Sequence, residues 1–485
     1  DNKIRSFKLK KGYSCTLANN PDGTGFSRVY IANDADIEVP EMPEGLEFVS
    51  FVRVFRWEWV GKKGICNGGL AAITNSSWYN DWAAGGATDN PDFEYVPMRH
   101  NLGWDSFETI NTRTNVSHVL GYNEPDHTDQ ANCTPIQAIR QWPELFKSGL
   151  RLGSPTPDAI RKDWLVKFLE LADSLNYRVD FVVGHMYWNG QSGQNLYNGV
   201  VDACTRLYGG RPMWITEWNN GANWTTENWP TNSGPQRDAD LNIIYDEDGN
   251  EKTVTRPLSP ENAAKQATWI LDALDGLERC EYLERHSLYN WVQDARAMVL
   301  DNKLTPAGKN FAAYKSKVGF SKAREYTHTW KIAPPLPNYT LSKDYKSITI
   351  SWYDHNGETG KNYTLQKSVD GGEWTDVKVF IAAAEMNPDN PLVYTYGSTI
   401  SYTEEIDCIS KVDYRIIALS YKDTQSSYSR TVSVTRDAVP DKPVLQGEAL
   451  SSKIIKLTWS AVDNARSYRL ERAESVNGEY TEIAN

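Results

Sequence analysis

The pattern of hydrophobic and polar positions changes character along the chain. From about residue 47 to residue 292, short apolar or β-branched runs alternate with amphipathic stretches of helical spacing. From about residue 333 onward, β-type runs follow one another with turn residues between them. Alternating strands and helices are typical of an α/β fold with a parallel sheet, whereas strands joined by turns are typical of a β-sandwich.

Eight strand-like runs lie in the first region. They cover residues 48–55, 71–79, 93–98, 117–122, 150–155, 180–188, 212–218 and 284–292. Eight strands with intervening helices predict an α/β fold of the (β/α)8 TIM-barrel type over residues 47–320. A doubly wound open sheet is the alternative, but no glycine-rich phosphate loop follows the first run.

Local sequence signals predict where several helices of this region begin. Thr134 precedes Pro135 and Ser259 precedes Pro260, which is the pattern of an N-cap residue followed by proline in the first helical turn. Residues 158–176 carry apolar side chains at helical spacing. The sequence therefore predicts helices after Thr134 and Ser259, a third over 158–176, and a closing helix within 306–318.

The connection between the seventh and eighth runs, residues 219–256, is longer than a plain loop. Within it, IIYDEDGNEKTV (243–254) predicts a hairpin with a glycine in its turn. Its acidic turn lacks the full twelve-residue pattern of a calcium loop. Long insertions in a barrel usually shape the functional face, so we expect this segment to lie near the site.

The C-terminal region contains an internal repeat. SITISWYD aligns with IIKLTWSAV, and NYTLQKSVDGGEW aligns with SYRLERAESVNGEY. These segments resemble fibronectin type III modules, which implies a β-sandwich over 333–436 and a partial second module over 437–485. Because half a sandwich leaves open edges, we expect the module to continue beyond this chain. Residues 1–46 carry two more strand-like runs, predicted as a hairpin that packs on the barrel or the sandwich.

Composition narrows the range of partners. The chain has 485 residues and a net charge of −12, which argues against nucleic acid and anionic membranes as partners. It has no apolar run of about 18 residues, so no membrane span is expected. Its six cysteines show no CxxC spacing, which argues against a zinc ribbon. We expect a monomer that needs no cofactor.

Aromatic residues are unusually frequent, with 18 Trp and 26 Tyr. They predict either a Trp-rich core or flat platforms on which sugar rings stack. The glycosylation sequon at Asn75 lies in an apolar run that leaves little room for a glycan, which favours a bacterial over a eukaryotic secretory origin. The expected location is secreted, periplasmic or cell-surface.

Active sites of (β/α)8 barrels lie at the carboxyl ends of the strands, so the residues that end each run are the first candidates. Those with polar or aromatic side chains are Arg53, Trp57, Trp78, Asn80, Arg99, Asn123, Glu124, Ser154, His185, Tyr187, Glu217, Asn290 and Trp291. This set contains two carboxylates, Glu124 and Glu217, and a single histidine, so a metal site is not expected.

Two glutamates across a barrel mouth are what glycoside hydrolysis requires. One protonates the leaving oxygen, and the other attacks the anomeric carbon or activates water. Their surroundings should differ, so that one is protonated and the other ionised. A structural ion pair, such as Glu124 with Arg99, is the alternative for each glutamate.

The ordered motifs WYNDW, YVPM, LGYNEPD with QANCTPIQA, GSPTP, VDFVVGHMYW and PMWITEW resemble glycoside hydrolase family 128, over roughly residues 70–300. The resemblance implies retaining, endo-type cleavage of laminarin-like β-1,3-glucan. It makes Glu124 the acid/base, Glu217 the nucleophile and Asn123 the partner of the sugar 2-hydroxyl. His185 and Tyr187 would then support Glu217. Burial is expected to raise the pKa of Glu124.

Further residues are predicted to bind sugar. These are Arg53, Arg99, Trp78, Asn80, Trp188, Trp218, Trp224, Asn290 and Trp291. For the tryptophans before residue 200, a place in the core is the alternative. Two other functions stay open: the same chemistry on another neutral glycan such as mixed-linkage glucan, galactan or xylan, and glycan binding without turnover.

Overall fold

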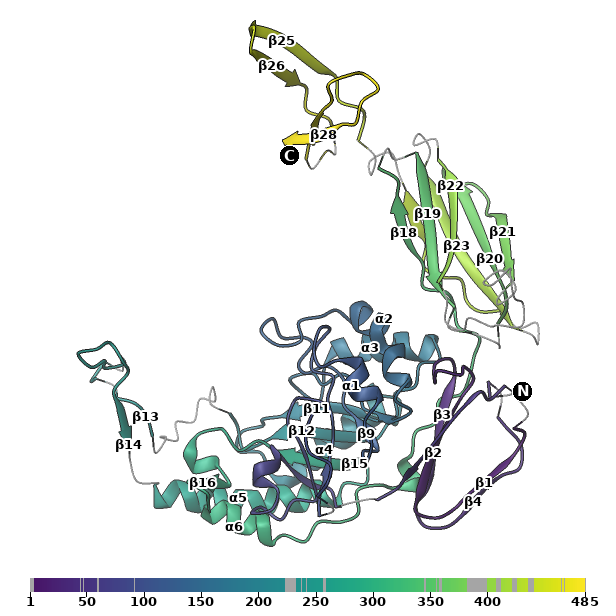
Figure 1. Cartoon of the computed structure of the whole chain (residues 1–485). Coiled ribbons are helices and arrows are strands. Elements are labelled where there is room, and N and C mark those ends of the chain that lie inside the picture. Colours follow the sequence, from purple (N-terminus) through teal and green to yellow (C-terminus); the bar gives the residue numbers. More distant parts are fainter. Residues whose placement is uncertain are drawn as a thin grey trace. The chain divides into compact units, whose positions relative to one another are not determined.

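The computed structural model describes residues 4–484 apart from 44, 47, 59–60, 91, 223–232, 237, 241, 256–258, 344–345, 355, 357–359, 382–398, 407–410, 421–424, 435–439, 464 and 466. The chain forms two compact units (Figure 1). One comprises Asp1–Lys331 and Asn356–Thr359, and the other comprises Ile332–His355 and Gly360–Asn485.

The first unit begins with antiparallel strands. β1 (Phe7–Leu9) pairs with β4 (Ile37–Val39), while β2 (Tyr13–Ala18) lies between β3 (Ser27–Ala32) and β5 (Phe51–Arg56). The prediction that residues 48–55 form the first barrel strand is therefore wrong, because β5 pairs antiparallel with β2 and joins this small sheet. Its alternating burial resembles that of any half-buried strand, so the pattern could not tell which sheet it joins.

Eight parallel strands follow. They are β6 (Lys63–Cys66), β7 (Trp78–Asn80), β8 (Glu94–Tyr95), β9 (His118–Val119), β10 (Arg151–Leu152), β11 (Val182–Met186), β12 (Met213–Trp218) and β15 (Leu283–Leu288). Six pair in the order β11-β12-β15-β6-β7-β8, and β9 pairs with β10. Parallel bridges from Met98 to Leu120 and from Gly153 to Phe181 join these two groups, so the pairings close on themselves.

The first of these strands, β6, was missed because its sequence KGIC is short and starts with lysine. Lys63 is buried, and its Nζ donates to the carbonyl oxygens of Phe311 at 2.6 Å and Tyr314 at 3.0 Å. Lys62 likewise donates to the carbonyl oxygen of Cys280 at 2.7 Å. These buried ammonium groups therefore donate hydrogen bonds to backbone carbonyl oxygens at the ends of helices. A pattern of hydrophobic residues cannot predict a buried lysine of this kind.

Six α-helices connect the strands in the described part of the first unit. They are α1 (Phe107–Asn111), α2 (Pro135–Phe146), α3 (Asp163–Ser174), α4 (Gly193–Asp202), α5 (Pro260–Arg279) and α6 (Pro306–Ala313). The predicted starts after Thr134 and Ser259 are confirmed, since both side chains cap the first turn. Neighbouring helices contact in pairs, α1 with α2, α2 with α3, α4 with α5 and α5 with α6.

Shorter elements complete this unit. They are η1 (Gly68–Leu70), η2 (Ala203–Leu207), η3 (Asp294–Arg296), η4 (Lys322–Arg324), β13 (Ser233–Pro235), β14 (Thr253–Thr255), β16 (Val299–Leu300) and β17 (Lys303–Leu304). In the insertion after β12, β13 pairs antiparallel with β14, and a bridge from Tyr245 to Glu251 closes the hairpin predicted at 243–254.

Inside the ring of strands, apolar and charged side chains form separate layers. The apolar cluster contains Trp78, Val96, Met98, Leu120, Phe181, Val183 and Trp214. Toward the amino ends of the strands lie buried ion pairs, in which Arg285 contacts Glu94 at 2.8 Å and Arg151 contacts Glu284 at 2.6 Å. Because each of these charges has a close partner, burial does not leave it uncompensated.

The second unit contains two antiparallel sheets whose facing side chains make a core. One sheet has the order β18 (Asn338–Leu341), β19 (Ser347–Tyr353), β22 (Thr399–Glu405). The other has the order β21 (Thr375–Ile381), β20 (Gly360–Val369), β23 (Val412–Ser420), β24 (Val432–Val434). The buried ring of Trp352 lies 5.9 Å from that of Tyr363, so the two sheets pack face to face.

Four further strands form two hairpins, β25 (Leu445–Ser451) with β26 (Ile454–Trp459), and β27 (Leu470–Arg472) with β28 (Thr481–Ala484). The rings of Trp459 and Tyr468 lie 5.8 Å apart, which matches the spacing of the pair at the aligned positions of the first repeat, Trp352 and Tyr363. The internal repeat found in the sequence is thus also a structural one.

Two sequence observations change in the structure. Asn75 is exposed, so its surroundings leave room for a glycan. The sequon at Asn75 therefore no longer favours a bacterial over a eukaryotic secretory origin. The five cysteines among the described residues are buried and unpaired. No helix in the described ranges is both long enough and apolar enough to cross a bilayer.

Candidate active site

The two predicted glutamates lie at the carboxyl ends of two segments of the parallel ring, with β10 and β11 between them. Glu217 lies on β12 and pairs in register with His185 of β11. Glu124 follows Asn123, which bridges to Thr156 beyond β10. Because parallel strands bring their carboxyl ends to one edge, both glutamates reach the same face of the ring.

The backbone at Glu124 turns sharply. Its φ is 39°, in the left-handed region that costs a side-chain-bearing residue about 1–2 kcal/mol. Hydrogen bonds hold the turn, since the Glu124 amide donates to the Thr156 carbonyl at 2.7 Å and the Asn123 amide donates to the His100 carbonyl at 2.8 Å. Pro125, the next residue, disfavours a right-handed helical conformation at Glu124.

His185 lies between the two carboxylates. Its Nδ1 is 2.8 Å from Oε1 of Glu124, and its Nε2 is 3.4 Å from Oε1 of Glu217. The imidazole is fully buried. One carboxyl oxygen of each glutamate and a ring nitrogen of His185 all lie within 4.8 Å of one another.

Glu217 accepts hydrogen bonds from two neutral groups. Nε1 of Trp82 donates to its Oε1 at 2.7 Å, and the hydroxyl of Tyr187 donates to its Oε2 at 2.6 Å. Hydrogen bonds to the charged form of a carboxylate stabilise that form. Glu217 is therefore held in one orientation with each oxygen engaged.

The pKa values of the Glu124–His185 pair move in opposite directions. Burial favours a raised pKa for Glu124, but the hydrogen bond and charge of His185 outweigh it and bring that pKa below its ordinary value. For His185, burial favours a lowered pKa, but the charges of Glu217 and Glu124 outweigh it and raise that pKa. The expectation that burial alone sets a raised pKa for Glu124 is wrong, because the sequence did not place His185 against it.

A cleft of about 550 Å³ opens over the glutamates. It is lined by Asp81, Trp82, His100, Trp104, Asn123, Glu124, Gln130, Tyr187, Glu217, Ala222, Tyr289 and Val292. Oδ1 of Asn123 has no hydrogen-bond partner among the described residues, and its Nδ2 donates to Gln130 at 3.3 Å. Asn123 thus places a side-chain amide in the cleft lining next to Glu124, with a buried and unpartnered Oδ1.

Among the described residues, Glu124, His185 and Glu217 also form a group whose possible metal-ligand atoms lie close together. We therefore compared their spacing with that of a metal site. Two ligand atoms on one zinc or similar ion, each about 2.0–2.2 Å from it, lie roughly 3 Å or more apart. The Nδ1–Oε1 separation of 2.8 Å instead matches a charge-assisted hydrogen bond. The geometry therefore fits proton exchange between His185 and Glu124.

Of the residues predicted from the sequence, the structure brings together Asn123, Glu124, Tyr187 and Glu217 at the cleft, with His185 directly beneath them. Trp291 is exposed beside the cleft, its ring 5.5 Å from that of Tyr289. Trp224 lies outside the described residues. The roles assigned to these residues remain predictions.

Both predicted arginines point elsewhere. Arg53 sits on β5, and its guanidinium donates to the carbonyl oxygens of Ser148 and of Arg113. Arg99 donates to the Leu102 carbonyl and stacks 4.0 Å from the ring centre of Phe107. Neither arginine lines the cleft, where the sequence predicted both to bind sugar.

Five other residues predicted to bind sugar do not line the cleft as the structure describes it. Trp78 and Trp218 are buried among aromatic rings. Trp188 packs against Gly199 of α4. Asn290 fixes the chain at Val299 through hydrogen bonds of 3.0 Å. Asn80 is fully buried, with neither side-chain polar atom partnered among the described residues.

Sequence reasoning missed eight residues that line the cleft, namely Asp81, Trp82, His100, Trp104, Gln130, Ala222, Tyr289 and Val292. All of them lie one to nine residues beyond a strand or strand-end bridge, in loops rather than in the strands themselves. Trp82 ends the motif WYNDW and was within reach of the sequence, but the strand-end rule stopped at Asn80.

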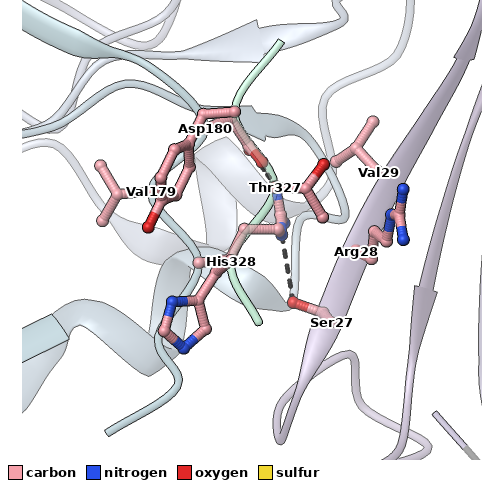
Figure 2. Close-up of a pocket in the computed structure, with 9 residues that line it drawn as sticks. Ser27, Arg28, Val29, Val179, Asp180, Thr327 and His328 are labelled. Carbon is pink, nitrogen blue, oxygen red and sulfur yellow. Dashed lines mark hydrogen bonds and ion pairs between the residues drawn. The ribbon is translucent and has the colours of Figure 1, made fainter. Parts of the chain in front are cut away.

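A second cavity, of about 20 Å³, lies at the opposite end of β11 (Figure 2). Ser27, Val29, Asp180 and His328 are among the residues that line it. Nε of Arg178 donates to Oγ of Ser27 across it at 3.1 Å. Its small volume holds no more than a water molecule, so its polar groups serve to join β3 to the ring of strands.

Comparison with solved structures finds members of GH128. An endo-β-1,3-glucanase from Amycolatopsis mediterranei in complex with laminaritriose is 21% identical, with a TM-score of 0.39 over 52% of this chain and 99% of that one. One from Pseudomonas viridiflava is 19% identical, with a TM-score of 0.38 over 53% and 98% of the two chains. A curdlan-specific exo-β-1,3-glucanase from Blastomyces gilchristii is 21% identical, with a TM-score of 0.37 over 52% and 98%.

No curated protein matches the chain. The family model described as glycosyl hydrolase catalytic core matches residues 63–311. This match begins at the first residue of β6 and ends within α6, so it spans the whole ring of parallel strands and both glutamates. It covers more than half of the 485 residues. The chain belongs to the glycosyl hydrolase catalytic core family, and its first unit carries a glycoside hydrolase domain.

Proposed function

We propose that this chain is a retaining, endo-acting glycoside hydrolase that cleaves β-1,3-linked glucan, with Glu217 as nucleophile and Glu124 as acid/base. One observation carries the proposal: carboxyl oxygens of the two glutamates approach within 4.8 Å at the mouth of the ring. Retaining glycosidases hold their carboxyl groups about 5–5.5 Å apart, whereas inverting enzymes need roughly 6.5–9.5 Å to admit a water molecule.

The proposed reaction has two displacements. In the first, Glu217 attacks the anomeric carbon, the bond from that carbon to the leaving oxygen breaks, and Glu124 gives its proton to that oxygen. In the second, Glu124 takes a proton from water, the water oxygen attacks the anomeric carbon, and the bond to Glu217 breaks. Trp82 and Tyr187 position Glu217, and Oδ1 of Asn123 accepts from the sugar 2-hydroxyl.

The proton that Glu124 delivers is shared with His185. In the free protein the raised pKa of His185 and the lowered pKa of Glu124 place this proton on Nδ1 of His185. As charge develops on the leaving oxygen, this proton passes from Nδ1 of His185 across the 2.8 Å hydrogen bond to Glu124, and Glu124 gives it to that oxygen. The pair therefore acts as one acid.

The substrate class rests on the ordered motifs that resemble glycoside hydrolase family 128, whose members cleave β-1,3-glucan. The lining of the cleft supports a neutral glycan, because none of the described lining residues is Lys or Arg. Aromatic side chains from Trp82, Trp104 and Tyr289 offer flat faces to sugar rings.

The rest of the proposal concerns architecture and location. The closed ring of parallel strands with helices between them supports a (β/α)8 barrel, and the two sheets of the second unit support a fibronectin type III-like module. We propose that such modules act as spacers and that the protein is a monomer. Because a polysaccharide does not cross a membrane unaided, a secreted, periplasmic or cell-surface location fits this substrate.

A panel of polysaccharides tests the proposal. Purified protein is incubated with laminarin, curdlan, mixed-linkage glucan, galactan and xylan, and products are separated by chain length. Release of short β-1,3-linked oligosaccharides from laminarin, abolished by Glu217→Gln, supports the proposal. Cleavage confined to another glycan overturns the substrate, and tight binding without new reducing ends overturns the enzymatic role.

A further inference from the structure

The described part of the first unit exposes two tryptophans, Trp104 at 47% and Trp291 at 43%, while its other described tryptophans are buried or half-buried. Single exposed apolar side chains are common on protein surfaces, but two large flat rings at one cleft are an arrangement on which sugar rings can stack. Both residues lie beside the cleft, Trp104 in its lining and Trp291 between the lining residues Tyr289 and Val292.

We propose that Trp104 and Trp291 are sugar-stacking platforms on opposite sides of the bond that is cleaved, with Trp104 on the leaving-group side and Trp291 on the side that becomes attached to Glu217. This inference rests on the proposed function and adds a direction to the bound glucan chain. It also gives the endo mode a structural basis, because sugar rings are held on both sides of the glutamates.

Trp104 belongs to the Glu124 side of the cleft. The carbonyl oxygen of His100 accepts the amide of Asn123 at 2.8 Å, which ties this loop to the segment that carries Glu124. The ring of His100 lies 5.1 Å from that of Trp104. Glu124 protonates the leaving oxygen, so a platform attached to its segment faces the sugar that leaves.

The loop of Trp104 is fixed although its ring is exposed. Oδ1 of Asn101 accepts the amides of Gly103 and Trp104, both at 2.8 Å. The Asn101 amide in turn donates to the Trp104 carbonyl at 2.7 Å. A flat ring on a backbone held by three hydrogen bonds loses little conformational entropy when a sugar stacks on it.

Trp291 belongs to the Glu217 side. Its ring lies 6.3 Å from that of Trp82, whose Nε1 donates to Glu217, and 5.5 Å from that of Tyr289. The ring of Tyr289 lies 6.1 Å from that of Tyr187, the second donor to Glu217. These four aromatic side chains therefore form one wall next to the nucleophile, where the glycosyl group is retained.

The assignment is tested with two substrates. Laminarihexaose needs platforms on both sides, whereas 4-nitrophenyl β-laminaribioside offers sugar rings only to the Glu217 side. The measured quantity is kcat/KM for each substrate in Trp104→Ala, Trp291→Ala and the wild type. Tyr13→Ala is the matched control, because Tyr13 is an aromatic residue that is 42% exposed on β2, outside the cleft.

Trp291→Ala is expected to lower kcat/KM on both substrates by roughly tenfold, the size of one lost stacking contact. Trp104→Ala is expected to lower kcat/KM on laminarihexaose, relative to kcat/KM on 4-nitrophenyl β-laminaribioside, by roughly tenfold. Tyr13→Ala should match the wild type on both substrates. Melting curves check that each variant is folded, and Trp→Phe at each position should recover part of the loss.

Three outcomes overturn the inference while leaving the proposed function intact: no change in either alanine variant, equal losses on both substrates in both variants, or a fall in the ratio for Trp291→Ala instead of Trp104→Ala. A wild-type protein that cleaves neither substrate overturns the proposed function, and the inference with it. The two failures are therefore told apart by the wild-type rates.

Discussion

Nδ1 of His185 lies 2.8 Å from Oε1 of Glu124, so the proton donor at this cleft is a pair of residues. The imidazole is fully buried and also faces Glu217 at 3.4 Å. One proton shared by Glu124 and His185 titrates as a property of the pair, with a macroscopic pKa that belongs to neither residue alone.

Replacing His185 tests this sharing. In His185→Gln, Glu124 loses the hydrogen bond and charge of His185, and the group that must be protonated for activity is a lone carboxylic acid. Because the raised pKa of His185 is lost, the alkaline limb of the kcat/KM profile is expected to move to lower pH. The maximal rate should fall by roughly 100-fold or more, because a general acid–base contribution is typically about 10²–10⁴-fold.

The control for that experiment is His328→Gln, because His328 lies at the opposite end of β11 from the glutamates and its Nε2 bonds to Asn176 at 3.1 Å. Its profile should keep the wild-type alkaline limb. An unshifted limb in His185→Gln would show that Glu124 holds its proton without His185.

Trp82 and Tyr187 are expected to act on Glu217 through their hydrogen bonds of 2.7 and 2.6 Å. Trp82→Phe and Tyr187→Phe keep an aromatic ring and remove the donor. Loss of a hydrogen bond to a charged group costs about 1.5–3 kcal/mol, which corresponds to roughly a 10–100-fold fall in kcat. Steady-state rates on laminarin give the answer, and wild-type kcat in either variant would contradict a role for that donor.

The two candidate catalytic residues could be predicted from the sequence, whereas most residues that line the cleft could not. Glu124 and Glu217 end apolar runs, and parallel strands bring such ends together, so their meeting followed from topology. The pattern could not show that Arg53 leaves the site, because alternating burial on β5 fits either sheet. Nor could it find Trp104, whose place depends on a loop held by Asn101 rather than on any strand.

Helix starts were the most predictable part of the fold. Thr134 and Ser259 cap helices whose first residue is proline, a local signal that tertiary packing does not override. The first parallel strand, β6, escaped prediction because its lysines are buried, with Lys63 bonded to carbonyl oxygens near the end of α6. Such a strand is defined by its tertiary partners and leaves no hydrophobic pattern.

The buried charges at the amino ends of the strands predict sensitivity to acid. Burial lowers the pKa of His118 from 6.5 to about 4, against the opposing charge of Glu94. The unfolded chain therefore binds a proton before the folded one does, and stability contributed by neutral His118 is present above pH 6.5 and lost as pH falls toward 4.

Melting temperatures measured between pH 7 and pH 4 check this prediction. The wild type is expected to lose stability more steeply across that window than His118→Gln, whatever the difference between the two proteins at pH 7. Burial opposes the low pKa of Glu94, but Arg285 and His118 outweigh it, so the slopes are compared above about pH 5, where Glu94 is ionised in the folded and the unfolded chain. Parallel slopes would contradict a neutral buried His118.

The most direct measurement is covalent trapping of the nucleophile. A 2-deoxy-2-fluoro-β-laminaribiosyl fluoride slows both displacements but forms the glycosyl-enzyme faster than it breaks down, so the sugar accumulates on the attacking residue. Peptide mass mapping of the wild type is expected to show one adduct, on Glu217, with none in Glu217→Gln. An adduct on another residue, or none on a protein that hydrolyses laminarin, would contradict the retaining mechanism built on Glu124 and Glu217.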